Sequence, residues 1–399
     1  MDDKKQGKKL NVPNLRFPEF TGEWKGYHTT DFLDFKNGLN PDKRKFGKGI
    51  KFISVMDILN NDFITYDKII NSVESNTKEI KDFGVNYGDI LFQRSSETLE
   101  DVGRANVYLD NKTALFGGFV IRGKKIGEYN PLFFRYLFSS PSVRKSVIVK
   151  GAGAQHFNIG QDGLRKVSIT IPDLSEQNKI SSLLNLIDNR IETQSKIIED
   201  LEKLKSAIIE KSYNQKHPNQ KIGDVISQTS TRNRNGNNSP VLSVNNRRGF
   251  IEQSEQFEDR LVASEDTSNY KIVRINDFAY NPARINVGSI ARLISFKEGI
   301  VSPMYICFKT KGEIHPEYLE HFFATRHFYY EMQKRLEGSV RSCLSWEGLC
   351  NIPIFIPTIK EQRYIGKQMI VLSDKIVSEK HYLELLKTQK QYLLNQMFI

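Results

Sequence analysis

The chain repeats its own organisation once. When its 399 residues are compared with themselves at an offset of 185, two long proline-free segments come into register. Residues 171–177 before the first segment match residues 356–362 before the second, and both stretches contain Ile-Pro followed by Glu-Gln. Residues 85–90 and 273–278 also resemble each other. A period this long indicates a duplicated domain and excludes a solenoid of short repeats.

Both long segments carry the heptad pattern of a coiled coil, with apolar residues at alternating spacings of four and three. Polar residues interrupt the two stripes at matched positions, where Gln194 aligns with Glu379 and Lys205 with Lys390. The predicted helix-pairing residues are Ile180, Leu184, Ile187, Ile191, Gln194, Ile198, Leu201, Ile208, Ile365, Met369, Leu372, Ile376, Glu379, Leu383, Leu386 and Leu393.

Each segment of about 38 residues would form a helix roughly 57 Å long. A helix with such a stripe cannot bury it alone, so we expect the two helices to pack on each other. We expect antiparallel packing about a pseudo-twofold axis, in which positions summing to 573 meet and Gln194 faces Glu379. A polar pair inside an apolar seam fixes register at some cost in stability.

The two globular segments read as mixed α/β, so the predicted fold class is a duplicated α/β (α+β) domain with two long antiparallel helices. The predicted strands are 51–55, 89–92, 114–121, 166–171, 241–244, 277–280, 288–294, 304–308 and 352–356. The predicted domain boundaries are an N-terminal tail at 1–20, a first domain at 21–174, a spacer helix at 175–213, a second domain at 214–357 and a second helix at 358–399.

A single aromatic-rich helix is predicted in each domain, over 130–147 and over 315–336. Because the aromatic residues recur at helical spacing, we favour a role in the core over one in stacking on bases. The aromatic residues concerned are Phe133, Phe134, Tyr136, Phe138, Tyr318, Phe322, Phe323, Phe328, Tyr329 and Tyr330.

The net charge of +11 lies mainly on the globular segments, because the N-terminal tail and the two helical segments together contribute only +4. Such an excess suits binding to a phosphate backbone, although lysine can also serve solubility alone. The sequence contains no apolar run long enough to span a membrane and no apolar signal core near its start. Its three cysteines all lie in the second half, which argues against a disulfide framework and favours a reducing cytoplasm.

The two copies differ most in polar loops that adjoin matched strands. Lysine and arginine pair well with guanine edges, and asparagine and glutamine with adenine edges, so these loops offer the groups needed to read bases. Basic loops are also common on surfaces without any such role. The candidate DNA-binding residues are Lys43, Arg44, Lys48, Gln93, Arg94, Ser95, Ser96, Arg104, Lys150, Gln155, Arg232, Arg234, Asn281, Arg284, Asn286, Arg341 and Ser342.

Patterns typical of catalytic sites are incomplete in this sequence. Residues 281–284 match a methyltransferase loop only in part, and Gly151-Ala152-Gly153 is too short for a dinucleotide fingerprint. A nuclease site could be built on the carboxylates Asp42 and Glu79. These residues have no counterpart in the second copy, which argues against such a site. Three histidines, at 315, 321 and 327, do not have zinc-finger spacing with Cys307. We therefore predict no catalytic residue, no metal site and no bound cofactor in this chain.

In the order of its motifs, the chain resembles the specificity subunits of type I restriction–modification enzymes. The resemblance rests on residues 13–20 with Gly22-Glu23-Trp24, on both Ile-Pro…Glu-Gln helix entries, and on the domain–helix duplication. It implies two target recognition domains that each read one half of a split, asymmetric sequence in double-stranded DNA. It also implies a bacterial, cytoplasmic complex with two methyltransferase subunits and motor-nuclease subunits, in which the partners use S-adenosylmethionine, ATP and magnesium.

Other function classes stay open at the level of sequence. The chain could be a self-contained DNA methyltransferase or nuclease with an unrecognised site, or a coiled-coil adaptor that does not bind DNA. Turnover by the isolated chain would identify an enzyme. Salt-dependent DNA binding would distinguish a DNA reader from an adaptor, because phosphate contacts make affinity fall with salt. The outward charges Arg190, Lys196, Lys375 and Lys380 are candidate partner contacts, although such charges are often merely solvated.

Overall fold

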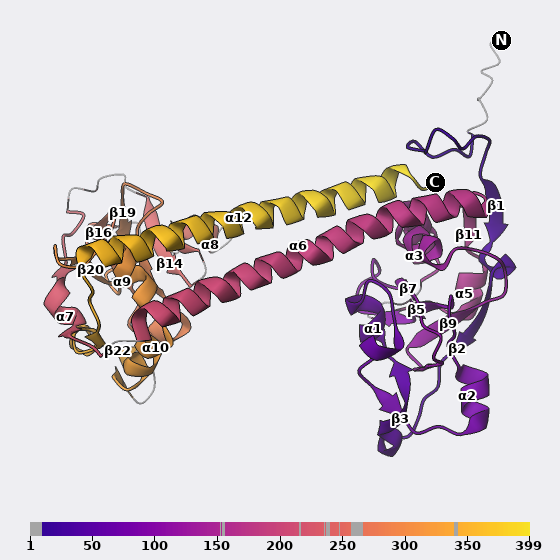
Figure 1. The fold of residues 1–399 in the computed structure, drawn as a ribbon, viewed down its shortest axis with the longest axis horizontal. Helices are drawn as coiled ribbons and strands as arrows, with labels where there is room; N and C mark the ends of the chain where they lie inside the picture. Colours follow the sequence, from indigo (N-terminus) through magenta and orange to yellow (C-terminus); the bar gives the residue numbers. More distant parts are fainter. Residues whose placement is uncertain are drawn as a thin grey trace, which may run out of the picture. The chain divides into compact units, whose positions relative to one another are not determined.

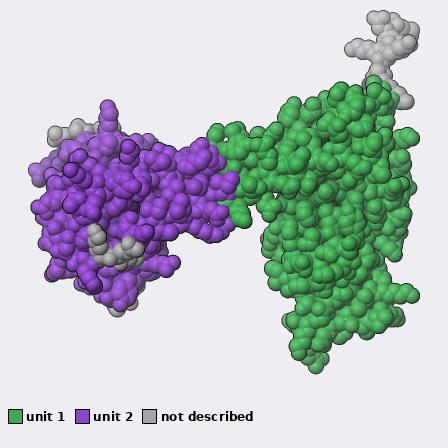
Figure 2. All heavy atoms as spheres, in the orientation of Figure 1, with its two compact units in different colours: residues 1–196, 381–399 green, residues 197–380 purple. Residues whose placement is uncertain are grey.

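The chain forms two compact units in the computed structural model, which describes residues 10–151, 153, 156–214, 217–234, 236, 240–246, 248–256, 266–338 and 342–399. Unit 1 comprises residues 1–196 and 381–399, and unit 2 comprises residues 197–380; Figure 2 colours them separately. Both units share the long helices, so the domain boundaries inferred from the sequence stay predictions. No helix in the described ranges has the length and apolar character needed to cross a membrane.

Unit 1 contains eleven strands of two to eight residues among its described residues, and five short helices precede the long helix α6. The strands are β1 (Lys25–His28), β2 (Leu33–Asn37), β3 (Phe46–Ile53), β4 (Ser72–Val73), β5 (Ile90–Gln93), β6 (Ser95–Ser96), β7 (Ala105–Val107), β8 (Leu115–Phe116), β9 (Val120–Lys125), β10 (Phe157–Asn158) and β11 (Ser168–Ile171). The helices are α1 (Val55–Asn60), α2 (Thr77–Phe83), α3 (Pro131–Ser139), α4 (Pro141–Ile148), α5 (Gln161–Arg165) and α6 (Leu174–Asn214) (Figure 1).

Unit 2 begins within α6 and ends within α12, and its domain lies between them in the chain. Its strands are β12 (Gln220–Lys221), β13 (Ile226–Thr229), β14 (Val241–Asn245), β15 (Gly249–Glu252), β16 (Lys271–Arg274), β17 (Phe278–Tyr280), β18 (Ile290–Arg292), β19 (Glu298–Val301), β20 (Ile306–Thr310), β21 (Leu336–Glu337), β22 (Cys343–Leu344) and β23 (Pro353–Ile354). Its helices are α7 (Ile222–Val225), α8 (Gln253–Gln256), α9 (Pro316–Phe322), α10 (Arg326–Gln333), α11 (Trp346–Cys350) and α12 (Ile359–Gln396).

The sheets of the two units follow the same strand order. The main sheet of unit 1 runs β2-β9-β5-β7, and the matched sheet of unit 2 runs β13-β20-β17-β18. Both are antiparallel, with Ile90 opposite Gly123 in unit 1 and Phe278 opposite Phe308 in unit 2. A second sheet pairs β3 with β8 in parallel, as β14 pairs with β19. The duplication read from the sequence is therefore a duplication of topology.

The repeated motif before the central strand is a tight turn closed by a carboxylate, which is buried at Asp89 and half-buried at Asp277. Asp89 accepts a hydrogen bond from the backbone N–H of Asn86 at 3.0 Å, and Asp277 accepts one from Arg274 at 2.8 Å. Burial raises the pKa of both carboxyl groups. The residue before each aspartate, Gly88 or Asn276, has a left-handed backbone with φ of 90° or 72°. Glycine and asparagine tolerate this conformation best, which explains the matched sequence.

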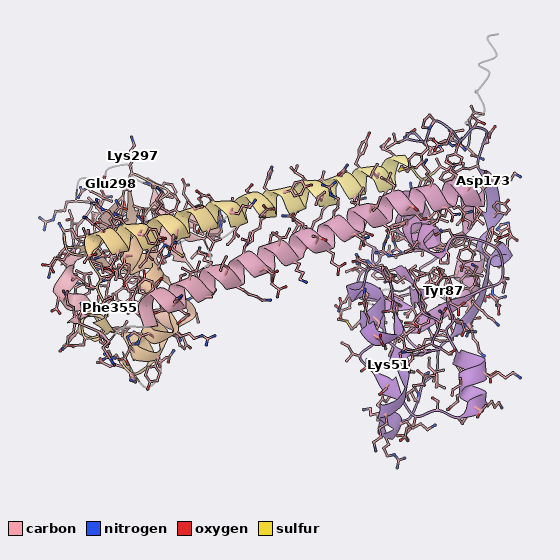
Figure 3. All side chains as sticks on the ribbon, viewed as in Figure 1. Lys51, Tyr87, Asp173, Lys297, Glu298 and Phe355 are labelled. Atoms are coloured by element: carbon pink, nitrogen blue, oxygen red, sulfur yellow. The ribbon has the colours of Figure 1, made fainter. Side chains whose placement is uncertain are left out.

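The repeated Ile-Pro…Glu-Gln motif caps each long helix and ties it to its domain. Asp173, labelled in Figure 3, accepts from the N–H of Glu176 at 2.9 Å, which satisfies one free donor of the first turn. The buried side chain of Gln177 accepts from the N–H of Asn130 at 3.0 Å and donates to the Pro172 carbonyl at 3.0 Å.

Gln362 makes the matched two bonds in unit 2, accepting from the N–H of His315 at 2.7 Å and donating to the Pro357 carbonyl at 2.9 Å. The glutamine of the motif therefore fixes the helix against the loop that precedes the aromatic helices. This role accounts for its presence in both copies.

The prediction of one aromatic helix per domain was wrong, because each is divided in two. Between α3 and α4, Ser140 has extended backbone angles (φ −68°, ψ 145°), as favoured before the proline at position 141. Between α9 and α10, Thr325 is extended, and its hydroxyl caps α10 by accepting from the N–H of Phe328 at 3.0 Å. The predicted strand 114–121 is also divided, by a turn over residues 117–119.

The aromatic side chains of these helices lie mostly in the core, as predicted. In unit 1, Phe133, Phe134, Tyr136 and Phe138 are all buried. In unit 2, Tyr318, Phe322 and Phe328 are buried and Phe323 is half-buried, whereas Tyr329 and Tyr330 are exposed. The core interpretation therefore fails for these last two tyrosines, which lie on the outer side of α10.

The two long helices pack antiparallel within each unit, which confirms the predicted coiled coil (Figure 1). In unit 1, the Arg190 guanidinium donates to the Tyr382 hydroxyl at 2.7 Å. In unit 2, Lys380 lies 2.7 Å from Glu202. The predicted pairing residues are all buried or half-buried. The pairing of Gln194 with Glu379 stays a prediction.

The matched lysines of the seam each reach a polar residue on the facing helix. Lys390 lies 2.5 Å from Asp188, and Lys205 donates to the Ser373 hydroxyl at 2.8 Å. Positions 188 and 373 are themselves related by the offset of 185, so the same crossing occurs in both units. The polar interruptions are thus pairing sites of the coiled coil.

The crossing in unit 1 is the more strongly charged. Asp188 is buried and also accepts from Arg135 at 3.1 Å and from the Tyr136 hydroxyl at 2.8 Å. One carboxylate therefore joins α3, α6 and α12.

Candidate nucleic-acid interface

Three short segments meet at one end of the main sheet of unit 1. They are residues 93–96, 117–119 and 157–159, and we call them the unit 1 loop cluster. The N–H of Arg94 donates to the Phe119 carbonyl at 2.9 Å, and the Arg94 carbonyl accepts from Ile159 at 2.9 Å. Ser95 pairs with Asn158 as β6 meets β10. The predicted DNA-binding residues Arg94, Ser95 and Ser96 therefore lie beside the turn 117–119, which was not identified as a candidate from the sequence.

Asn40, which precedes the basic segment 43–48 in the chain, lies beside the 117–119 turn of this cluster. A side chain at Gly118 would place its first carbon 1.9 Å from the Asn40 side-chain oxygen, so a larger residue there would displace the Asn40 side chain. The basic residues Lys43, Arg44 and Lys48 are exposed beyond this contact. Arg44 forms an ion pair at 3.1 Å with exposed Asp42, an interaction that solvent weakens.

Two predicted base readers are buried. Gln93 is 6% exposed and Asn281 is 9% exposed, and they occupy matched positions at the end of β5 and β17. Gln93 donates to the Ser95 carbonyl at 2.8 Å, and Asn281 accepts from the N–H of Ala283 at 3.1 Å. Each amide therefore shapes the loop that follows its strand, and contact of either residue with DNA stays a prediction.

Two further predicted residues of unit 1, Arg104 and Lys150, are exposed. The carbonyl of Arg104 accepts from the N–H of Gln93 at 2.8 Å, and its exposed guanidinium pairs with Asp101 at 2.6 Å. Lys150 is exposed at the end of α4, and Gln155 lies outside the described residues.

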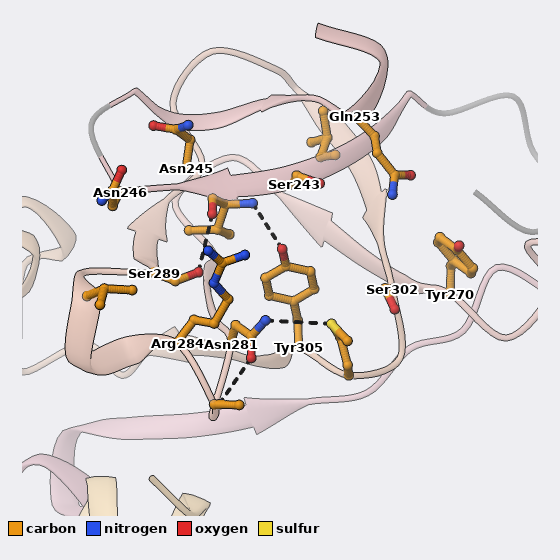
Figure 4. Close-up of a pocket in the computed structure, with 15 residues that line it drawn as sticks. Ser243, Asn245, Asn246, Gln253, Tyr270, Asn281, Arg284, Ser289, Ser302 and Tyr305 are labelled. Atoms are coloured by element: carbon orange, nitrogen blue, oxygen red, sulfur yellow. Dashed lines mark hydrogen bonds between the residues drawn. The ribbon is translucent and has the colours of Figure 1, made fainter. Parts of the chain in front are cut away.

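A polar cavity of about 850 Å³ opens in unit 2 and is drawn in Figure 4. It collects side chains from β14, α8 and the loops that follow β17 and β19. Tyr305 helps to hold its wall, because its hydroxyl accepts from the N–H of Val244 at 3.3 Å. The polar lining residues are Ser243, Asn245, Asn246, Gln253, Tyr270, Asn281, Arg284, Ser289, Ser302 and Tyr305.

Arg284 is the predicted residue best placed to bind a ligand in this cavity. Its side chain is exposed, and Figure 4 shows its guanidinium between the strand that carries Ser243 and the loop that carries Asn281. Within the described ranges, the guanidinium has no hydrogen bond or ion pair. An unpaired arginine beside several amides and hydroxyls can bind a guanine edge or a phosphate through two N–H groups.

The other predicted residues of unit 2 that the structure describes are all exposed. Arg232 is exposed and donates to the Asn269 side chain at 3.0 Å. Arg234, Asn286 and Ser342 are exposed, and Asn286 lies in a 3₁₀ turn that follows Arg284. Arg341 lies outside the described residues.

Sequence reasoning missed several of the cavity's polar residues. Asn246 follows a correctly predicted strand, so a polar pair at positions 245–246 was an available signal. Gln253 and Ser302 gave no such signal, because they reach the cavity only through the pairing of β14 with β15 and β19.

Two of the histidines considered as metal ligands, His321 and His327, lie in surroundings that the structure describes. Burial and the nearby cations Lys205 and Arg292 lower the pKa of His321 to about 4, so this histidine is neutral at pH 7. His327 hydrogen bonds to the Pro353 carbonyl at 3.0 Å. In the part of the chain that the structure describes, no three His, Cys, Asp or Glu side chains group as metal ligands would.

Comparisons with known proteins agree on one family. Residues 21–203 match the family model described as the type I restriction modification DNA specificity domain. The type I restriction enzyme MjaX specificity subunit of Methanocaldococcus jannaschii is 23% identical over 425 residues, covering 97% of this chain and 96% of the relative.

Two solved structures share the fold. The type I restriction–modification S subunit from M. genitalium superposes with a TM-score of 0.58 at 16% identity, covering 97% of this chain and 99% of that one. The second is a chain from a structure on complex assembly and conformational transition of the type I R-M system. It superposes with a TM-score of 0.56 at 13% identity, covering 93% of this chain and 96% of that one. The chain is therefore similar to type I restriction–modification specificity subunits over nearly its full length, and its residues 21–203 match the specificity domain of that family.

Proposed function

We propose that this chain is the non-catalytic subunit that recognises DNA for a type I restriction–modification complex. Each unit would read one half of a bipartite target. The observation that carries the proposal is the unpaired Arg284 within a polar cavity, at the end of a sheet whose counterpart in unit 1 carries the Arg94 loop. Since the two sets of loops differ in sequence, the two half-sites should differ, and the target should be asymmetric.

The positive charge of the domains supports this proposal over a coiled-coil adaptor. Binding of the assembled complex to its target duplex should weaken linearly in log affinity with log salt, because bound phosphates release counterions. The test is a set of binding isotherms across salt concentrations with target and scrambled duplexes. An adaptor would show neither salt dependence nor preference, and an enzyme in its own right would turn over DNA without partner subunits.

Arg284→Ala should lower affinity for the target by about 1–3 kcal/mol, or roughly 5- to 150-fold, because one bidentate base contact is lost. Arg274→Ala is the matched control, since it removes the same charge from unit 2 at an arginine already paired at 2.9 Å with Glu298, labelled in Figure 3. The control should change affinity less than about twofold, because exposed charges are screened. Equal losses for both variants would assign the effect to net charge and count against base reading.

We further propose that the helix pair docks the methyltransferase subunits, and that its length sets the gap between half-sites. An open, mostly apolar groove of about 570 Å³ follows the helices of unit 2. Leu204, Tyr364 and Val371 line it and are all exposed, and Lys367 and Lys375 also line it. Exposed apolar surface bordered by charge is typical of a protein interface.

Val371→Asp should weaken association with the methyltransferase subunit about tenfold or more, because it places a charge in the groove. Val377→Asp is the control on the same helix: Val377 is 67% exposed, against 62% for Val371, and does not line the groove. Subunit association can be followed by analytical ultracentrifugation of purified components. If the two variants associate equally, the methyltransferase docks elsewhere.

In this scheme the chemistry belongs to the partners. We propose two methyltransferase subunits that use S-adenosylmethionine to methylate adenine, and motor-nuclease subunits that use ATP and magnesium. This chain would bind none of these cofactors and would act in the bacterial cytoplasm, where its partners meet DNA.

A further inference from the structure

Two large apolar side chains are exposed at matched positions of the two units. Phe119 in unit 1 is 68% exposed, and Met304 in unit 2 is 60% exposed. They are related by the same offset of 185 as the long helices. Each lies in the turn that leads into the second strand of its main sheet, β9 or β20.

The backbone at both positions is held firmly. In unit 1, the N–H of Val120 donates to the Gly117 carbonyl at 2.8 Å, and Arg94 donates to the carbonyls of Phe119 and Gly118 at 2.9 and 3.3 Å. In unit 2, the N–H of Tyr305 donates to the Ser302 carbonyl at 3.1 Å. The turn is therefore the same in both copies, and each exposed side chain extends from an ordered base.

The surroundings of these side chains are polar and cationic. Phe119 belongs to the unit 1 loop cluster and is bonded through its carbonyl to Arg94. Met304 lines the cavity of Arg284, and its sulfur accepts from the Asn281 side chain at 3.6 Å (Figure 4). A partner that satisfies both features must combine apolar faces with negative charge. Nucleic acid does so, because its bases are apolar on their faces and its phosphates are anionic.

We propose that Phe119 and Met304 are specificity-determining residues that make the apolar contacts with the DNA bases, one in each half-site. The proposal rests on the function inferred above and adds residues that sequence reasoning did not single out. Phenylalanine and methionine both occur as wedges inserted at base steps, and phenylalanine also contacts the methyl group of thymine. An aromatic ring in one unit and a flexible thioether in the other would also contribute to the difference between half-sites.

The experiment measures binding of the assembled complex to its target duplex across salt concentrations. Phe119→Ala should weaken binding roughly 5- to 150-fold, the range found when a side chain stacked on a base is removed. The slope of log affinity against log salt should stay unchanged, because no phosphate contact is lost. Met304→Ala should show the same pattern, and the double variant should show the product of both effects.

Matched controls exist at the opposite end of each sheet. Ile126 follows β9 just as Phe119 precedes it, and it is similarly exposed. In unit 2, Phe278 pairs with Arg292 on one side and with Phe308 on the other, so these three residues mark one end of the sheet. The exposed Ile294 follows Arg292 at that end, whereas Met304 precedes Ile306 at the other end. Ile126→Ala and Ile294→Ala should bind DNA like the unmodified chain. Thermal unfolding of all four variants checks that the fold is retained.

Two modified duplexes locate the apolar contact. Replacing thymine by uracil at each position removes only the methyl group, and it should weaken the unmodified chain but not Phe119→Ala if that methyl is the contact. 2-Aminopurine placed at each step should brighten on binding if the side chain opens the stack, and Phe119→Ala should abolish this increase.

The outcomes separate the inference from the proposed function. If the unmodified complex prefers its target and both alanine variants bind equally well, the inference is overturned and the function stands. A loss of methyltransferase association with unchanged DNA binding would assign this face to a protein partner and would also overturn it. If the unmodified complex shows no sequence preference, the proposed function fails first.

Discussion

Asp188→Leu should destabilise unit 1 by about 3–5 kcal/mol, because it leaves two cations without their buried partner. Asp188 is 2.5 Å from Lys390 and 3.1 Å from Arg135, and all three side chains are largely buried. The substitution also removes the acceptor of the Tyr136 hydroxyl. The loss should appear in urea unfolding and as faster amide exchange in the first turns of α6 and the last turns of α12.

Ser373→Ala provides the matched control in unit 2, where only the hydrogen bond from Lys205 is lost. It should cost about 1 kcal/mol, since an uncharged acceptor is removed. Combining Asp188→Leu with Lys390→Met should restore part of the stability, because the stranded charge is removed as well. If Asp188→Leu were as mild as Ser373→Ala, the charged crossing would not stabilise the helix pair.

Replacing residues 21–174 with the corresponding domain of another family member should change one half of the recognised sequence completely and leave the other half unchanged. Unit 2 has its own sheets and its own core, so its reading loops do not depend on the replaced residues. The measurement is the consensus of methylated sites in cells that carry the hybrid chain.

The reciprocal replacement of residues 214–357 should change the other half. Neither hybrid should change the gap between the halves, because both keep residues 175–213 of α6 and the whole of α12. A hybrid with both halves altered would mean that the two domains read DNA jointly, and the modular account would be wrong.

The domain–helix duplication could be predicted from the sequence, because the same motifs and the same spacing of apolar residues occur in both halves. The heptad stripe and its lysine interruptions follow helical periodicity, so a helix pair could be anticipated, and the duplication favoured antiparallel packing. The partners of the two lysines, Asp188 and Ser373, lie outside the predicted stripe and were not anticipated. The fold of each domain was predicted less well. The division of the aromatic helices depends on a single proline at 141 in one copy and on a threonine cap at 325 in the other.

The candidate interface could be predicted only in outline. Loops after β5 and β17 were identified correctly as polar and different, yet Gln93 and Asn281 proved to be buried amides that shape those loops. Whether such an amide is buried depends on which strands pair with each other. The periodicity of the sequence does not reveal this pairing. Met304 and Gln253 reach the cavity of Arg284 from segments distant in sequence, so they could be recognised only once the sheets were assembled.

The central claim is that two unlike units each read half of one DNA target. The most direct measurement is genome-wide mapping of methylated adenines in cells that carry this chain with its partner subunits, compared with cells that carry the 21–174 hybrid. The account predicts a split, asymmetric consensus with a constant gap, of which the hybrid retains one half. A continuous consensus, or a hybrid that retains neither half, would contradict it.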